Sequence, residues 1–272
     1  MSSVSNKTIE RIKSSLKRFQ PIIQSAKARD VNESDTVTIV VDVLEHMFGY
    51  DKYAEITSEY SIRGTFCDLA IKIDGTLLLL IEVKGIGLDL KDIHVKQAVD
   101  YAANQGLEWV GLTNGSEWRV YKVTFGKPIN ADLVVNFNLL DISLKDNEGI
   151  ERIALLAKEG WQKANLEQYN TVKQILNRFT IGAILSTSPV VDVMRRELRR
   201  ISPDIKVSED GIRELLQNDV IKREVLEGEK AQQAQKQVTK AGKRLLRKIS
   251  EKENTENDNV DASCTVIDHE AN

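Results

Sequence analysis

The stretch "LLLLIEVKG", residues 77–85, is the feature that most limits how this chain can fold. Its first five residues are all apolar, which is typical of a strand that enters a hydrophobic core. Glu82 and Lys84 follow directly at its end. Side chains two apart on a strand point to the same face, so these two project together while Val83 points away. Because burying a charge is unfavourable unless it is paired or binds a metal, the pair indicates a functional site.

The preceding segment "FCDLAIKI", residues 66–73, contributes a second acid, Asp68. Whether it faces Glu82 depends on the connection at Asp74 and Gly75. A two-residue turn pairs position 68 with 81 and puts the acids on opposite faces. A three-residue loop, or a bulge, pairs 68 with 82 and makes the carboxylates neighbours. Neighbouring carboxylates repel each other unless a cation lies between them, and their oxygen atoms favour Mg²⁺ or Mn²⁺.

Helical and strand-like patterns alternate through the first half of the chain. They predict helices at 5–28 and 34–48, the second ended by Gly49, strands at 55–62, 66–73 and 77–84, a helix at 91–105, and strands at 109–114, 117–123 and 133–139. This order indicates an α/β fold. From about residue 147 the pattern is helical. Ser188, as N-cap before Pro189, suits a helix start, and further helices are expected at 208–227 and 229–250. From Glu251 onward the sequence is expected to be disordered.

These residues resemble the PD-(D/E)XK nuclease superfamily, in which an aspartate and an E-x-K element lie on a hairpin framed by helices. More closely, "GTFCDLAIKIDGTLLLLIEVKG", "HVKQAVDYAANQGLEWVGLTNGSEWRVY" and "ESDT" are similar to the N-terminal nuclease-like domain of type I restriction enzyme R subunits, which also has stand-alone relatives. The resemblance covers about residues 31–142, and more weakly the chain to about 228. Cys67 takes the place of the family's proline.

The resemblance implies a restriction-endonuclease-like mixed β-sheet flanked by helices, with a helical C-terminal region. The expected division is an N-terminal helix at 1–30, a nuclease-like domain at 31–142, a helical region at 143–228, and a basic polar helix with a disordered acidic tail at 229–272. Roles for individual residues follow as well. Glu33, Asp68 and Glu82 would hold Mg²⁺ or Mn²⁺ with the Val83 carbonyl as a further ligand. Lys84 would orient the attacking water and stabilise charge on the phosphate.

Several further residues have two interpretations. Gln97 and Tyr101 are four residues apart and share one helix face. They match a Q-x-x-x-Y element that in the family supports the catalytic residues or contacts the DNA backbone, but they could equally pack the helix against the sheet. Glu33 either completes the metal site or caps its helix. Asp42 and Glu45, later on that helix, are weaker candidates for the metal site.

The function that the resemblance implies is that of a metal-dependent endonuclease hydrolysing DNA phosphodiester bonds in restriction or defence against foreign DNA. The sequence contains no G-x-x-x-x-G-K-[ST] phosphate loop, so the chain by itself would not translocate DNA. Double-strand cleavage by one site needs two copies, which favours a homodimer. The alternative is a catalytically inactive nuclease-fold module that binds DNA or assembles with a separate ATPase, methyltransferase or other restriction subunit.

Composition and charge limit the remaining classes. No apolar stretch approaches the roughly 18–20 residues of a membrane span, and the N-terminus has no apolar signal-peptide core, so no membrane association is expected. Two distant cysteines, Cys67 and Cys264, argue against a disulfide framework and suit a reducing cytoplasm. Residues 230–249 hold seven Lys and Arg and no acid, whereas 250–272 hold seven Asp and Glu. The basic segment is either a footprint for a polyanion or a solvated helix face.

Overall fold

The computed structural model describes residues 4–62, 65–204 and 206–263. Contacts divide the chain into two compact units, Met1–Thr171 and Val172–Asn272. Sequence patterns suggested boundaries near 30, 142 and 228. The N-terminal unit instead includes both the first helix and the segment after 142, because both pack on the same hydrophobic core as the sheet.

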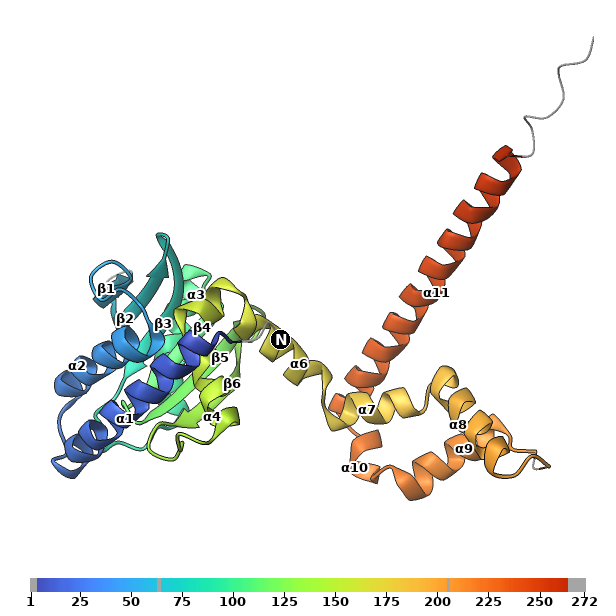
Figure 1. Cartoon of the computed structure of the whole chain (residues 1–272), viewed down its shortest axis with the longest axis horizontal. Coiled ribbons are helices and arrows are strands. Elements are labelled where there is room, and N and C mark those ends of the chain that lie inside the picture. Colours follow the sequence, from blue (N-terminus) through green and yellow to red (C-terminus); the bar gives the residue numbers. More distant parts are fainter. Residues whose placement is uncertain (1–3, 63–64, 205, 264–272) are drawn as a thin grey trace, which may run out of the picture. The chain divides into compact units, whose positions relative to one another are not determined.

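A six-stranded mixed sheet forms the centre of the N-terminal unit (Figure 1). Its strands are β1 (Ile56–Ile62), β2 (Thr65–Ile73), β3 (Thr76–Val83), β4 (Trp109–Thr113), β5 (Glu117–Thr124) and β6 (Asn130–Asn138), and they lie in this order across the sheet. β3 and β4 are parallel, whereas all other neighbours are antiparallel. The parallel pair follows from the helix α3 (Asp92–Gln105), which connects the two strands. The expected mixed sheet flanked by helices is confirmed.

Helices cover both faces of this sheet (Figure 1). Besides α3, they are α1 (Asn6–Ala28), α2 (Glu33–Val43), its π-helical continuation η1 (Leu44–Phe48), α4 (Asn147–Ala154) and α5 (Lys158–Gln162). The helix α6 (Asn165–Ile175) begins in this unit, where Leu166 packs on the core, and runs past Thr171. α1, α2 and α4 share one core with Ile81, whereas α3 shares the other with Leu80. Successive residues of β3 thus enter opposite cores, which is why this strand is apolar without alternation.

The β2–β3 hairpin combines the short turn with a bulge. Its turn consists of Asp74 and Gly75, whose φ angles of 50° and 76° are those of a type I′ turn. The register then shifts by one residue, so that Leu69 pairs with Ile81. Leu78 is the extra residue of the bulge in β3. Continued by one step, this register brings position 68 opposite position 82, the arrangement that a functional site requires.

The C-terminal unit is helical, as expected. Its helices are α7 (Arg178–Leu185), α8 (Ser188–Ile201), α9 (Glu209–Leu215), the π-helical turn η2 (Leu216–Val220), α10 (Arg223–Leu226) and α11 (Glu229–Ser263). A small core of Val191, Ile212, Leu216 and Ile221 holds α8 and α9 together. Within the described part of either unit, no helix is both long and apolar enough to span a membrane.

Three expectations for this unit are corrected. The N-cap of α8 is Thr187, and Ser188 is the first helical residue. The single helix expected at 208–227 is interrupted, because Ile221 is extended and enters the small core. The disorder expected from Glu251 is wrong as far as Ser263, since α11 continues to that residue. Residues 264–272 lie outside the described part of the chain.

Candidate active site

At the end of β3, the buried Glu82 forms an ion pair with Lys84, which is partly buried. The Lys84 Nζ donates to Glu82 Oε1 at 2.7 Å and lies 3.6 Å from Glu33 Oε2. The Glu82 side chain is 3% exposed, and its Oε2 has no hydrogen-bond partner among the described residues. Buried polar atoms are nearly always satisfied, so this oxygen marks a place for a further cation or donor.

Asp68 reaches the same place from β2. Its Oδ2 accepts the backbone N–H of Val83 at 2.7 Å. The last regular pair of β2 and β3 is Leu69 with Ile81. The Asp68 carboxylate therefore accepts a backbone N–H of β3 just beyond the point where hydrogen bonding between the two strands ends. Asp68 is half-buried, and its charge acts on Glu82. The bulge in β3 therefore brings the two acids to one location, as the sequence required for a site.

Burial is the largest influence on the charges at this location. It raises the pKa of Glu82, which the hydrogen bond from Lys84 lowers only in part and the charge of Asp68 raises further. Burial also raises the pKa of Asp68, against the lowering effect of the Val83 N–H. The pKa of Lys84 is lowered by burial, but its hydrogen bond to Glu82 and the surrounding acids outweigh this and raise it overall. The site has a shortage of positive charge, which a divalent cation relieves.

The first turn of α2 brings Glu33 beside Lys84. Asn32 caps this helix by accepting a backbone N–H at 2.9 Å, so Glu33 is not the cap. Thr36 anchors the turn, because its buried Oγ1 accepts the N–H of Ile86, just past β3, at 3.1 Å. The Glu33 side chain is 50% exposed and points one carboxylate oxygen at the Lys84 ammonium.

The donor set at this location fits a hard divalent cation. Carboxylates of Glu33, Asp68 and Glu82, with the Val83 carbonyl, are the oxygen ligands that Mg²⁺ and Mn²⁺ prefer. The Oε2 of Glu82 supports this fit, since this oxygen can act as a metal ligand and accepts no hydrogen bond from the described residues. The three carboxylates do not come within 4.8 Å of one another as a set, because the Lys84 ammonium lies between Glu33 and Glu82.

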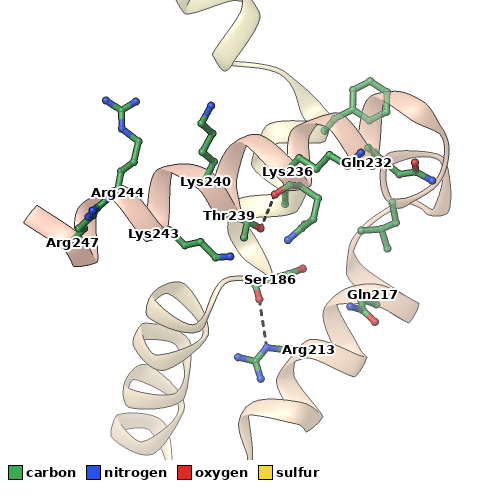
Figure 2. Close-up of a pocket in the computed structure, with 16 residues that line it drawn as sticks. Ser186, Arg213, Gln217, Gln232, Lys236, Thr239, Lys240, Lys243, Arg244 and Arg247 are labelled. Carbon is green, nitrogen blue, oxygen red and sulfur yellow. Dashed lines mark hydrogen bonds between the residues drawn. The ribbon is translucent and has the colours of Figure 1, made fainter.

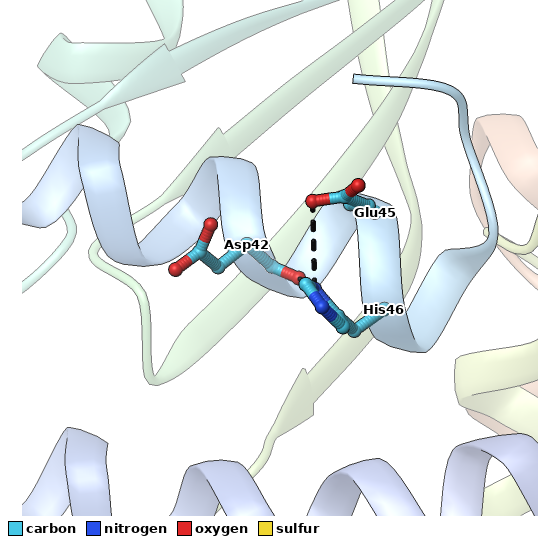
Figure 3. A group of neighbouring side chains, drawn as sticks. All are labelled: Asp42, Glu45 and His46. Atoms are coloured by element: carbon cyan, nitrogen blue, oxygen red, sulfur yellow. Dashed lines mark hydrogen bonds and ion pairs between the residues drawn. The ribbon is translucent and has the colours of Figure 1, made fainter.

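A different group of ligand atoms does come this close. Asp42, Glu45 and His46 approach one another within 4.8 Å, the one such group among the described residues (Figure 3). They lie at the junction of α2 and η1, where spacings of three and four residues share a helix face. Lys52 already pairs with Asp42 at 3.1 Å, and His46 lies 3.6 Å from Glu45. Because a lysine and solvent balance these partly exposed acids, the group gives no separate reason to place a metal here.

Gln97 and Tyr101 lie together on α3. The Gln97 Nε2 donates to the Tyr101 hydroxyl at 2.8 Å. The Tyr101 ring packs partly against the core beneath α3, whereas Gln97 is exposed. Within the described part of the chain, no hydrogen bond links either residue to Glu82 or Lys84. The pair therefore combines a packing role with a polar end at the surface of the helix.

The roles of two residues beside the site were missed by reasoning from the sequence. Thr36 supplies the anchor described above, and Cys67 lies behind Asp68 with its thiol fully buried. The Cys67 Sγ donates to the carbonyl of Ile81 at 3.4 Å. Burial, reinforced by the charge of Glu82, raises the pKa of this thiol to about 12, so it stays protonated. No spacing rule predicts either role, because both roles arise from contacts between distant segments.

Comparisons of the chain with protein-family models, with curated proteins and with solved structures find no match.

Proposed function

We propose that this chain is a Mg²⁺- or Mn²⁺-dependent endonuclease of the restriction-endonuclease type that hydrolyses DNA phosphodiester bonds. The observation that carries the proposal is the Glu82 carboxylate, which is enclosed, has one oxygen on Lys84 and the other unpartnered, and lies beside a second acid. A purely structural ion pair would satisfy both oxygens, since a half-satisfied buried carboxylate is unfavourable for folding.

Each residue of the site has a role in this proposal. Glu33, Asp68, Glu82 and the Val83 carbonyl hold the cation, which when bound polarises the phosphoryl oxygen and lowers the pKa of the attacking water. Lys84 is enclosed between two acids and stays protonated, so it supplies positive charge where the phosphate becomes more negative. Gln97 and Tyr101 offer polar atoms to the DNA backbone.

The test is nicking of supercoiled plasmid by the purified chain with Mg²⁺ or Mn²⁺. Glu82→Ala and Asp68→Ala are expected to lower the rate by more than about 100-fold, because even changes around a metal's ligands lower activity 10- to 100-fold. Glu117→Ala is the matched control, since Glu117 is a half-buried strand carboxylate paired with Arg119 at 2.6 Å. Equal nicking rates for Glu82→Ala and the parent chain would show that this site is not the nuclease active site.

The second candidate is a non-catalytic module that binds DNA or assembles with a separate ATPase, methyltransferase or restriction subunit. The observation that favours it is the Lys84 ammonium, which already lies between Glu33 and Glu82 and can neutralise them without a metal. Salt-dependent DNA binding without cleavage in any divalent metal, together with no heat of Mn²⁺ binding by calorimetry, would select this candidate.

Double-strand cleavage adds a prediction about assembly to the first candidate. One site cuts one strand, so coordinated cleavage of both requires two copies of the chain. A homodimer in restriction or defence would convert plasmid directly to the linear form, whereas a monomer would accumulate nicked circles first. Sedimentation velocity with and without a DNA duplex measures whether the protein is a monomer or a dimer.

A further inference from the structure

A groove in the C-terminal unit carries an unbalanced positive charge. It has a volume of about 1100 Å³ and lies between α11 and the segments α7, α9, η2 and α10. Six of its lining residues are Lys or Arg, and none is acidic: Arg213, Lys236, Lys240, Lys243, Arg244 and Arg247. Figure 2 shows that all of these except Arg213 come from the single helix α11.

The basic residues of α11 form one stripe. Lys236, Lys240, Lys243 and Arg244 follow one another at spacings of four, three and one, and spacings of three and four keep side chains on one helix face. All four are exposed, and no ion pair links them to an acid among the described residues. By contrast, Arg213 in the same groove is balanced by Glu209 at 2.9 Å.

This stripe is unfavourable for the isolated chain. Lys236 and Lys240, and then Lys240 and Arg244, are like charges at i, i+4, and each such pair destabilises a helix by roughly 0.2–0.5 kcal/mol. Residues 230–249 contain no acid that could relieve them. A helix surface that keeps its charges unpaired in this way is suited to an anionic ligand that supplies the missing charge.

We propose that this groove binds the phosphate backbone of duplex DNA, as a second contact in addition to the candidate active site. The inference rests on the proposed function for its choice of DNA as the polyanion. Lys236 to Arg247 extends about 16 Å along the helix at 1.5 Å per residue. One DNA strand carries about five phosphates over that axial length. Gln217 adds a neutral donor of the kind that contacts phosphate and sugar without reading sequence.

An acidic protein segment is the other anion that could fill the groove, but the regular stripe favours DNA. The cations occupy a single straight helix with a fixed rise, which matches a ligand whose charges repeat regularly. An acidic peptide has flexible and irregular charges and gains more from bidentate arginine contacts than from lysines. Three of the four unpaired residues are lysines, which bind phosphate as point charges.

The test measures binding by the full chain, in EDTA, to a fluorescent duplex of about two helical turns between 50 and 200 mM salt. The triple variant Lys240→Ala, Lys243→Ala and Arg244→Ala removes up to three phosphate contacts, so the slope of log affinity against log salt should become shallower by about 2.7. Over this fourfold change in salt the parent chain should therefore lose about 40-fold more affinity than the variant. An unchanged slope and affinity would overturn the proposal.

The control carries the same loss of charge on another helix. Lys7, Lys17 and Lys27 are exposed on α1, and their replacement by alanine should leave the salt slope unchanged. The groove variant should fold, because alanine is the best helix former and the change removes like-charge pairs. Competition by polyglutamate as strong as by unlabelled duplex, at equal charge, would instead assign the groove to acidic chains.

The two proposals fail separately in these experiments. Glu82→Ala should lose cleavage and keep the salt-dependent binding. Loss of binding in the groove variant, with no cleavage by the parent chain in any metal, would retain the groove and reject the nuclease. Cleavage by the parent chain, with unchanged binding by the groove variant, would retain the nuclease and reject the groove as a DNA-binding site.

Discussion

Lys84→Ala tests whether the buried ion pair controls the stability of the N-terminal unit. The substitution removes the ammonium 2.7 Å from Glu82, whose side chain is 3% exposed. Breaking a buried pair from one side is destabilising by about 3–5 kcal/mol, because the remaining charge is left without a partner. The second contact, to Glu33 at 50% exposure, adds no more than about 1 kcal/mol. We therefore expect a loss of about 3–5 kcal/mol at pH 8.

All three tryptophans, Trp109, Trp118 and Trp161, lie in the N-terminal unit, so their fluorescence in urea reports on this unit alone. The expected loss corresponds to a fall of roughly 6–20 °C in the thermal midpoint at about 2–4 °C per kcal/mol. The loss should shrink toward pH 5, because burial raises the pKa of Glu82 and protonation then removes the unpaired charge.

Lys122→Ala is the matched control. The Lys122 side chain is 18% exposed, close to the 16% of Lys84, and it also contacts two glutamates. Those partners, Glu108 and Glu167, are 56% and 49% exposed, so the expected loss is below about 2 kcal/mol, including the contact with the Trp109 ring. Equal losses for the two lysines would refute the reasoning from burial.

A double-mutant cycle separates the charge from the packing of the lysine stem. In a Glu82→Gln background the buried negative charge is already gone. Lys84→Ala should then destabilise by only about 1 kcal/mol, which implies a coupling energy of at least about 2 kcal/mol between the two residues. A loss of the same size in both backgrounds would show that the stem, and not the ion pair, matters.

The remaining predictions concern the ion, the thiol and the turn. Burial raises the pKa of Glu82 and Asp68, so the native state holds protons that the unfolded chain releases, and stability falls as pH rises above the ordinary carboxyl range. Mg²⁺ should therefore raise the thermal midpoint more at pH 8 than at pH 5, and Glu82→Gln should reduce this difference. In a Cys264→Ser chain, Cys67 should not react with a thiol reagent at pH 8 until urea unfolds the unit, because its pKa is about 12; prompt reaction would show that it is accessible. Gly75→Ala should destabilise by about 1 kcal/mol in urea, since φ is 76° and no neighbour lies within 4 Å to add a clash; no loss would contradict the left-handed turn.

Much of the N-terminal unit could be predicted from local patterns. The apolar run at 77–81, the D-G turn and the helix that ends at Gly49 each depend on residues close in sequence, and the structure confirms them within a few residues. The same locality explains the errors in the C-terminal unit. The helix expected at 208–227 breaks because Ile221 enters a core formed with Val191, a contact between distant segments.

The candidate site shows the same limit more sharply. The sequence alone determined which residue types lie at the end of β3 and that Glu82 and Lys84 share a face, because strand periodicity is a local property. It left the facing of Asp68 open between two registers. Only the tertiary structure decided it, through the bulge at Leu78, which depends on how β3 packs between two cores. The enclosure of Glu82 and the approach of Glu33 are likewise products of packing, since burial and its effect on charge arise only when distant segments exclude water together.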